Sequence, residues 1–98
     1  MPSASRKTDT ASDHAGFPPT DATTGSGDVE INGLPALRVG DAFADHSKPN
    51  HPPHPRSLSA GSPTVFINGL AAGRVGDAVD CGGSVISGSP DVEFDSGA

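Results

Sequence analysis

A segment of 17 residues occurs twice in this chain, and this internal repeat limits the fold more than any other feature. The first copy, residues 25–41, reads GSGDVEINGLPALRVGD. The second, residues 61–77, reads GSPTVFINGLAAGRVGD and follows 36 residues later without a gap. A degenerate third copy, GSPDVEFDSG, begins at Gly88. Self-similarity at a fixed period is the signature of repeat architectures, so we expect similar units packed around a pseudo-threefold axis.

Each copy contains the pattern of a short β-hairpin. Apolar residues alternate along the first part of each copy, which predicts a strand. Asn32-Gly33 and Asn68-Gly69 come next, and both residue types tolerate the positive φ of a tight hairpin turn. The predicted strands are residues 29–31, 34–39, 65–67, 70–75 and 92–94. No segment has a helical period, so the expected fold is all-β, with few or no helices.

The segments between these hairpins carry no regular pattern. We expect residues 9–24, 42–60 and 78–87 to be irregular. The middle segment contains four prolines, which predict a stiff, extended chain. These prolines are Pro49, Pro52, Pro53 and Pro55.

The composition leaves little material for a hydrophobic core. Only 33% of the 98 residues are hydrophobic, and 13 glycines and 10 prolines make up almost a quarter of the chain. Ordering each residue costs roughly 1–2 kcal/mol of backbone entropy, which so small a core cannot offset alone. Cys81 is the single cysteine, so no intramolecular disulfide is available. The remaining sources of stability are a metal or a partner.

Charge and hydropathy exclude several classes of function. The net charge is −6 and the six Lys and Arg residues are scattered, so we expect no nucleic-acid partner. No apolar run reaches the length of a membrane span. The polar residues 1–9 do not resemble a signal peptide. We therefore expect a protein made in the cytoplasm, which something else carries if it leaves the cell.

Metal-ligating side chains recur at one place in the repeat. His14 and His46 each lie five residues after an aspartate, Asp9 and Asp41, and Cys81 lies four residues after a third, Asp77. Three His with one Cys would form a closed tetrahedral set typical of structural zinc. The loop of the second unit offers two further histidines as the fourth ligand, and the spacing leaves that choice open. They are His51 and His54. With five candidate ligands, a closed site is favoured over a catalytic one that keeps a position for water.

The aspartates and arginines of the repeat have simpler interpretations. No run matches a calcium-binding loop with its terminal Glu. Asp after Gly is typical of a turn in which the carboxylate binds local backbone N–H groups. Arg38 and Arg74 either pair with such aspartates or lie exposed on their strands.

The words LPALRVGD and LAAGRVGD resemble the Pro-Ala-Ala-Arg motif, followed by Val-Gly-Asp, that names the PAAR-repeat family. The first copy departs from the motif at Leu37, and the second departs at Ala71 and Gly73. GSPTVFING and CGGSVISGSP resemble the same family. The likeness covers about residues 8–98, which we take as one PAAR-repeat domain after a flexible lead-in of residues 1–7.

This resemblance implies a conical β-structure with one structural zinc near its point, held by three His and one Cys. The residues that match the family's ligands are His14, His46, His54 and Cys81, with His51 as the surplus histidine. The base would sit on a trimeric β-helical spike, one tip per trimer, in a type VI secretion system, a contractile phage tail or a related injection particle. Such a tip would have no enzymatic activity. It would be delivered across the target cell envelope and would contact the target membrane transiently.

Two other functions compete with this interpretation. A free-standing zinc hydrolase would use an open three-histidine site, and a metal-buffering or adaptor protein would keep disordered loops. The repeat does not distinguish a phage tail from a secretion system, and it names neither the spike partner nor a cargo.

Overall fold

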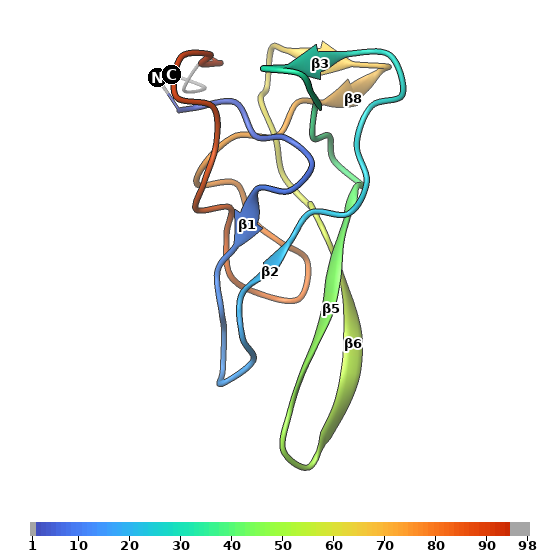
Figure 1. The fold of residues 1–98 in the computed structure, drawn as a ribbon, viewed down its shortest axis with the longest axis vertical. Coiled ribbons are helices and arrows are strands. Elements are labelled where there is room, and N and C mark those ends of the chain that lie inside the picture. Colours follow the sequence, from blue (N-terminus) through green and yellow to red (C-terminus); the bar gives the residue numbers. More distant parts are fainter. Residues whose placement is uncertain (1, 95–98) are drawn as a thin grey trace.

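The computed structural model describes residues 2–94, which form short antiparallel hairpins and, within that range, no helix. No helix that could cross a membrane is therefore found among these residues. The all-β prediction is confirmed. Four two-stranded sheets pair β1 with β2, β3 with β4, β5 with β6 and β7 with β8 (Figure 1). The strands are β1 Thr10–Ala11, β2 Thr20–Asp21, β3 Glu30–Ile31, β4 Leu34–Pro35, β5 Ala42–Lys48, β6 His51–Ser57, β7 Phe66–Ile67 and β8 Leu70–Ala71.

The repeat hairpins form where the sequence predicts them, but their return strands are shorter. Asn32 and Asn68 both have φ of 55°, as a tight turn requires. The strands β4 and β8 end after two residues instead of six. Beyond them the chain leaves its own hairpin and pairs with the next unit, as in the antiparallel bridge between Arg38 and Ala72. The repeat units are thus joined to one another by their backbones.

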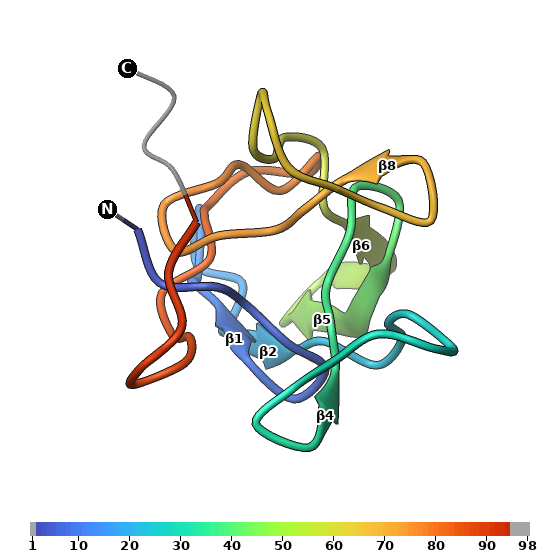
Figure 2. The same cartoon turned by 90° about the horizontal axis from the view of Figure 1, so that it is seen from above.

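A triangle of backbone hydrogen bonds defines the pseudo-threefold axis. The N–H of Ser5 donates to the carbonyl of Gly73, Gly73 N–H donates to Leu37, and Leu37 N–H donates to Ser5, at 2.8–3.0 Å. We call these three residues the backbone triangle. Figure 2 shows the loops arranged around this axis when the molecule is seen from above. The triangle is closed only because the N-terminal segment supplies one of its corners.

Residues 3–6, expected in a flexible lead-in, are part of the packed domain. Ala4 and Ser5 are fully buried. Ala4 N–H donates to the carbonyl of Val92, and Ser89 N–H donates to that of Ala4. Ser3 forms an antiparallel bridge with Glu93, as Pro35 does with Glu30. The third repeat unit is therefore assembled from both ends of the described chain.

Each unit contains an ion pair between an arginine and the aspartate three residues later. The pairs Arg6–Asp9, Arg38–Asp41 and Arg74–Asp77 have N–O distances of 2.8–3.0 Å. In each pair the carboxylate also accepts the backbone N–H of its arginine. Of the two alternatives for Arg38 and Arg74, pairing with an aspartate is therefore the one observed. The residues Arg6-Lys7-Thr8-Asp9 form a third copy of the same turn.

The segment 42–60, expected to be irregular, instead contains the longest hairpin. Its register is interrupted on either side of His46, and the three prolines of β6 lie in a strand that pairs on one edge only. Proline is tolerated there because a free edge needs no N–H donor. The hairpin extends away from the repeat hairpins and narrows the molecule, whose extents are 40 × 28 × 23 Å (Figure 1). We call the broad end with β3 and β8 the flat end.

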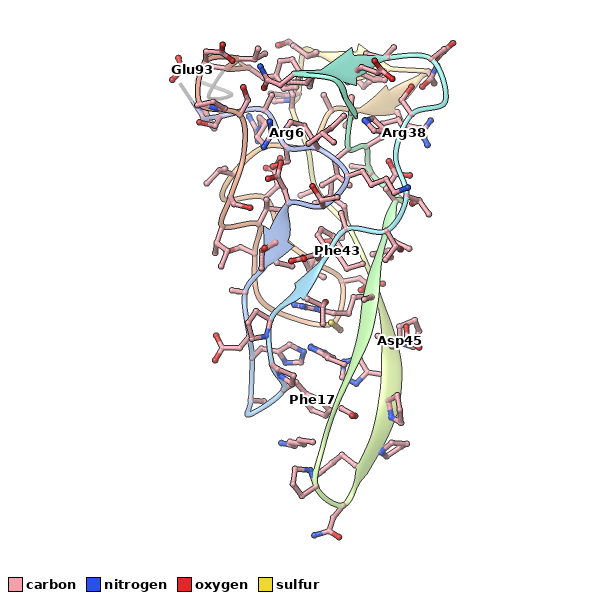
Figure 3. The ribbon with its side chains drawn as sticks, in the orientation of Figure 1. Arg6, Phe17, Arg38, Phe43, Asp45 and Glu93 are labelled. Carbon is pink, nitrogen blue, oxygen red and sulfur yellow. The ribbon has the colours of Figure 1, made fainter. Side chains whose placement is uncertain are left out.

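Two small cores fill this tapering body. The core nearer the flat end contains Ile31 and Ile67 with three buried alanines. The second core surrounds Leu37, Phe43 and Leu58. Figure 3 shows Phe43, near the start of the long hairpin, about midway between the flat end and the narrow end, with Phe17 further toward the narrow end. Cores of this size support the expectation that something else adds to the stability.

Candidate metal centre

Four side chains from separate parts of the sequence meet below the second core. Their ligand atoms all lie within 4.8 Å of one another. We call this set the metal group; it consists of His14, His46, His54 and Cys81. Two turns and the long hairpin supply its members, so the site exists only when the whole lower half of the molecule is folded.

The long hairpin places two of the ligands opposite each other. His46 on β5 and His54 on β6 are register partners, and their Nε2 atoms are 2.6 Å apart. The Nε2 of His14 lies 3.2 Å from that of His46. The Sγ of Cys81 lies 3.8 Å from the same His46 nitrogen. All four ligand atoms therefore converge on one point.

Backbone contacts fix which nitrogen of His46 faces the group. Its Nδ1 lies 2.8 Å from the carbonyl oxygen of Pro18. A carbonyl oxygen can only accept, so Nδ1 carries a proton, and in that tautomer of the imidazole the Nε2 lone pair is directed at the metal group. A backbone carbonyl that orients a ligand histidine in this way is a common second contact in metal sites.

The donor set fits zinc. Structural zinc sites are tetrahedral and use nitrogen at ~2.0–2.1 Å and thiolate sulfur at ~2.3 Å, which puts ligand atoms roughly 3.3–3.6 Å apart. The separations of 3.2 Å from His46 to His14 and 3.8 Å from His46 to Cys81 are close to this range, whereas the 2.6 Å between His46 and His54 is shorter and would widen around an ion. Four protein ligands also leave no coordination position for water, as in a structural site.

His51 is not part of the metal group. It pairs with Lys48 near the end of the hairpin and is exposed. Its ring lies edge-on to Phe17, with 5.8 Å between centroids. Of the two histidines left open by the sequence, His54 lies in the metal group and His51 lies outside it, and the identity of the fourth ligand stays a prediction.

Phe17 covers the histidines, a role that the sequence did not reveal. Its ring centroid lies 4.5 Å from that of His54, 4.9 Å from that of His46 and 5.4 Å from that of His14. Lys48 lies over the Phe17 ring, with 4.7 Å between its Nζ and the ring centroid. Its Nζ also donates to the carbonyl of Ala15, which ties the long hairpin to the turn that carries Phe17. The only sequence signal was a lone aromatic residue three positions after His14.

Arg56 is the second residue that the sequence did not reveal. It is 1% exposed, and its Nε donates to the Sγ of Cys81 at 3.3 Å. The same guanidinium donates to the carbonyls of Ser12 and Gly82 and to the hydroxyl of Thr20. A buried cation against the sulfur matches the negative charge of a metal-bound thiolate.

The surroundings of His14 favour its neutral form and bring it close to the cysteine loop. Burial lowers the pKa of His14, and repulsion from His46 and Arg56 adds to this. A neutral imidazole is the form that binds a metal. Gly82 has φ of 113°, and a Cβ there would lie 3.1 Å from Cγ of His14. The Cys-Gly-Gly sequence thus lets the cysteine turn approach the histidine.

Comparison with known proteins gives one family. The model of the PAAR motif family matches residues 18–87, which is more than half of the chain. The match includes three members of the metal group, His46, His54 and Cys81, whereas His14 precedes it. A search of curated proteins found no match. From the family match, the paired Arg-Asp turns and the repeat hairpins, we conclude that this chain belongs to the PAAR motif family.

Proposed function

We propose that this protein is the tip of a membrane-piercing spike in a contractile injection machine. Its flat end caps a trimeric β-helical spike, and its narrow end leads into the target envelope. The observation that carries the proposal is the pseudo-threefold flat end, built by one chain around the backbone triangle of Ser5, Leu37 and Gly73. A single chain with three similar units matches the blunt end of a trimer.

Free strand edges at the flat end support docking by strand pairing. Among residues 2–94, β3 pairs only with β4 and β7 only with β8, so the outer edge of each hairpin has no strand partner there. Unpaired edges accept strands of a partner, through main-chain hydrogen bonds. The third unit offers the corresponding residue, Glu93, which bridges to Ser3.

Exposed apolar side chains lie on the same hairpins. Phe66 is 60% exposed and Leu70 is 42% exposed, and Val29 is also exposed. Large exposed apolar side chains grouped on one end are typical of an interaction site. They give the flat end an area that a partner could cover.

In this proposal the metal group binds one structural zinc, and the protein is not an enzyme. His14, His46, His54 and Cys81 would hold the ion, and Phe17 would shield it from water. Zinc binding contributes on the order of 10 kcal/mol to the folding of small domains, which suits a protein with two small cores. A hydrolase would instead need an open coordination position for water.

The stoichiometry of the complex tests the proposal. The protein is mixed with the trimeric β-helical spike protein of the same genome, and the mass of the complex is measured under native conditions. We expect one tip per trimer, because a pseudo-threefold monomer occupies the whole blunt end. Three tips per trimer, or no complex, would contradict a capping function.

A further inference from the structure

The three equivalent edge positions at the flat end do not carry the same residue. Glu30 pairs with Pro35, Phe66 pairs with Ala71, and Glu93 bridges to Ser3. These pairings place Glu30, Phe66 and Glu93 at the same point of their respective units, and all three are exposed. Figure 3 shows Glu93 at the flat end. The flat end therefore combines a threefold backbone with two acidic positions and one aromatic position.

Neither glutamate is neutralised within the described part of the chain. The ion pairs found for residues 2–94 join Arg6, Arg38 and Arg74 to the aspartates three residues later. Asp28 and Asp91, each two residues before a glutamate, add negative charge and accept hydrogen bonds from Asn68 and Asn32 respectively. Both acidic positions are thus available to a cationic partner.

A symmetric trimer presents the same side chain at each of the three positions. An apolar side chain there would suit Phe66 but would bury two unpaired carboxylates at Glu30 and Glu93, which is costly. An acidic side chain would repel both glutamates. A cationic side chain suits all three positions, because it pairs with a carboxylate and also stacks over an aromatic ring.

We infer that the spike trimer presents one Lys or Arg per subunit to this flat end, and that these three cations pair with Glu30 and Glu93 and stack on Phe66. This inference rests on the proposed capping function. It names the chemistry of the partner surface and explains how a tip with unequal units fits a symmetric trimer. The charges also select against spike trimers that have a neutral or acidic blunt end.

A charge-reversal pair with a matched control tests the inference. The double variant Glu30→Lys/Glu93→Lys is compared with Asp13→Lys/Asp45→Lys, which makes the same change of net charge at two exposed residues that adjoin His14 and His46, away from the flat end. Affinity for the spike trimer of the same genome is measured by calorimetry. We expect the affinity of the first variant to fall by at least ~100-fold, because like charges in an interface repel strongly. The affinity of the second variant should stay within about twofold of that of the unmodified protein.

Milder variants separate charge from folding. Glu30→Gln/Glu93→Gln should keep the melting temperature, weaken binding by about tenfold and reduce the dependence of affinity on salt. Phe66→Leu keeps an apolar side chain but loses the ring, and should weaken binding by about threefold. Equal effects of the two charge-reversal variants, or tighter binding of Glu30→Lys/Glu93→Lys, would overturn the inference while the capping function stands. Failure of the unmodified protein to bind any spike trimer would instead contradict the capping function itself.

Discussion

The Nε of Arg56 lies 3.3 Å from the Sγ of Cys81, inside a site whose other neighbours are three histidines. Among residues 2–94 the other three arginines each form an ion pair with a carboxylate, whereas Arg56 has two carbonyls, a hydroxyl and this sulfur around it. The sulfur is the atom that becomes negatively charged when a metal binds. If the proposed metal binds, the guanidinium and the metal-bound thiolate would stabilise each other.

Replacing Arg56 by Met should weaken metal binding without removing a ligand. The change keeps a long side chain but leaves the carbonyls of Ser12 and Gly82 without their donor. Loss of such a supporting contact typically lowers metal affinity by about 10–100-fold. Competition with a chromogenic chelator measures the affinity, and Co²⁺ in place of zinc reports on the thiolate through its absorption band. Unchanged affinity together with an unchanged cobalt spectrum would show that Arg56 only fills space.

The sequence predicted the features that recur at equivalent positions of the repeat units, and it missed those that occur in one unit only. The strands, the turns and three members of the metal group occupy equivalent positions in successive units, so one copy supports the interpretation of another. These three members are His14, His46 and Cys81. Phe17 and Arg56 have no counterpart in the other units, and their roles depend on contacts between segments far apart in the chain. The long hairpin was missed because its prolines argue against a strand unless one edge is known to be free.

The N-terminal unit was missed although a signal was present. Arg6 and Asp9 have the same spacing as Arg38 and Asp41, but the residues between them are Lys-Thr instead of Val-Gly. Thr8 stands where the other units have glycine, and this substitution hid the third copy of the turn. In the structure Thr8 has φ of 81°, close to the 96° of Gly40.

Thr8→Gly should stabilise the protein. A β-branched residue at positive φ is strained by about 1–2 kcal/mol, whereas glycine adopts this conformation freely. The backbone N–H of Thr8 keeps its bond to the carbonyl of Ala22 in either case. We expect the free energy of unfolding to rise by about 1 kcal/mol in urea titrations of the metal-loaded protein. The reverse change at the equivalent position, Gly40→Thr, is the control and should lower it; a stabilising Gly40→Thr would show that backbone strain is not the cause.

Ala4→Asp should destabilise the domain much more than Lys7→Asp. Ala4 is fully buried between the first and last units, whereas Lys7 is exposed in the same segment. A buried unpaired carboxylate costs at least about 3 kcal/mol, while the surface change costs less than about 0.5 kcal/mol. Unfolding in urea measures both. If the two variants were equally stable, the N-terminal segment would lie outside the cooperative unit.

His54→Ala should release the metal, and His51→Ala should not. His54 faces His46 across one pair of the long hairpin, whereas His51 pairs with Lys48 near the hairpin end and its ring lies edge-on to Phe17, outside the metal group. Losing one of four ligands opens the site and removes part of the stability that the metal adds. We expect a large fall in metal content and melting temperature for His54→Ala alone. The opposite order in metal analysis would make His51 the ligand.

Removing the metal should loosen the narrow half of the protein before the flat end. The metal group joins the His14 turn, the long hairpin and the Cys81 turn, which share one small core around Leu37 and Phe43. The flat end has its own core and the backbone triangle. Regions with fewer buried contacts open at lower free energy, and hydrogen exchange detects such local opening.

The experiment compares amide exchange in the metal-loaded protein and after treatment with a chelator. Exchange should accelerate most between residues 44 and 55, while the amides of Ser5, Leu37 and Gly73 remain protected. The affinity for the spike trimer should fall only if the amides of these three residues also lose protection, because the metal group lies away from the flat end. Uniform acceleration would show that the molecule opens as one unit. Release of the trimer while the triangle stays protected would instead mean that the metal group belongs to the docking surface.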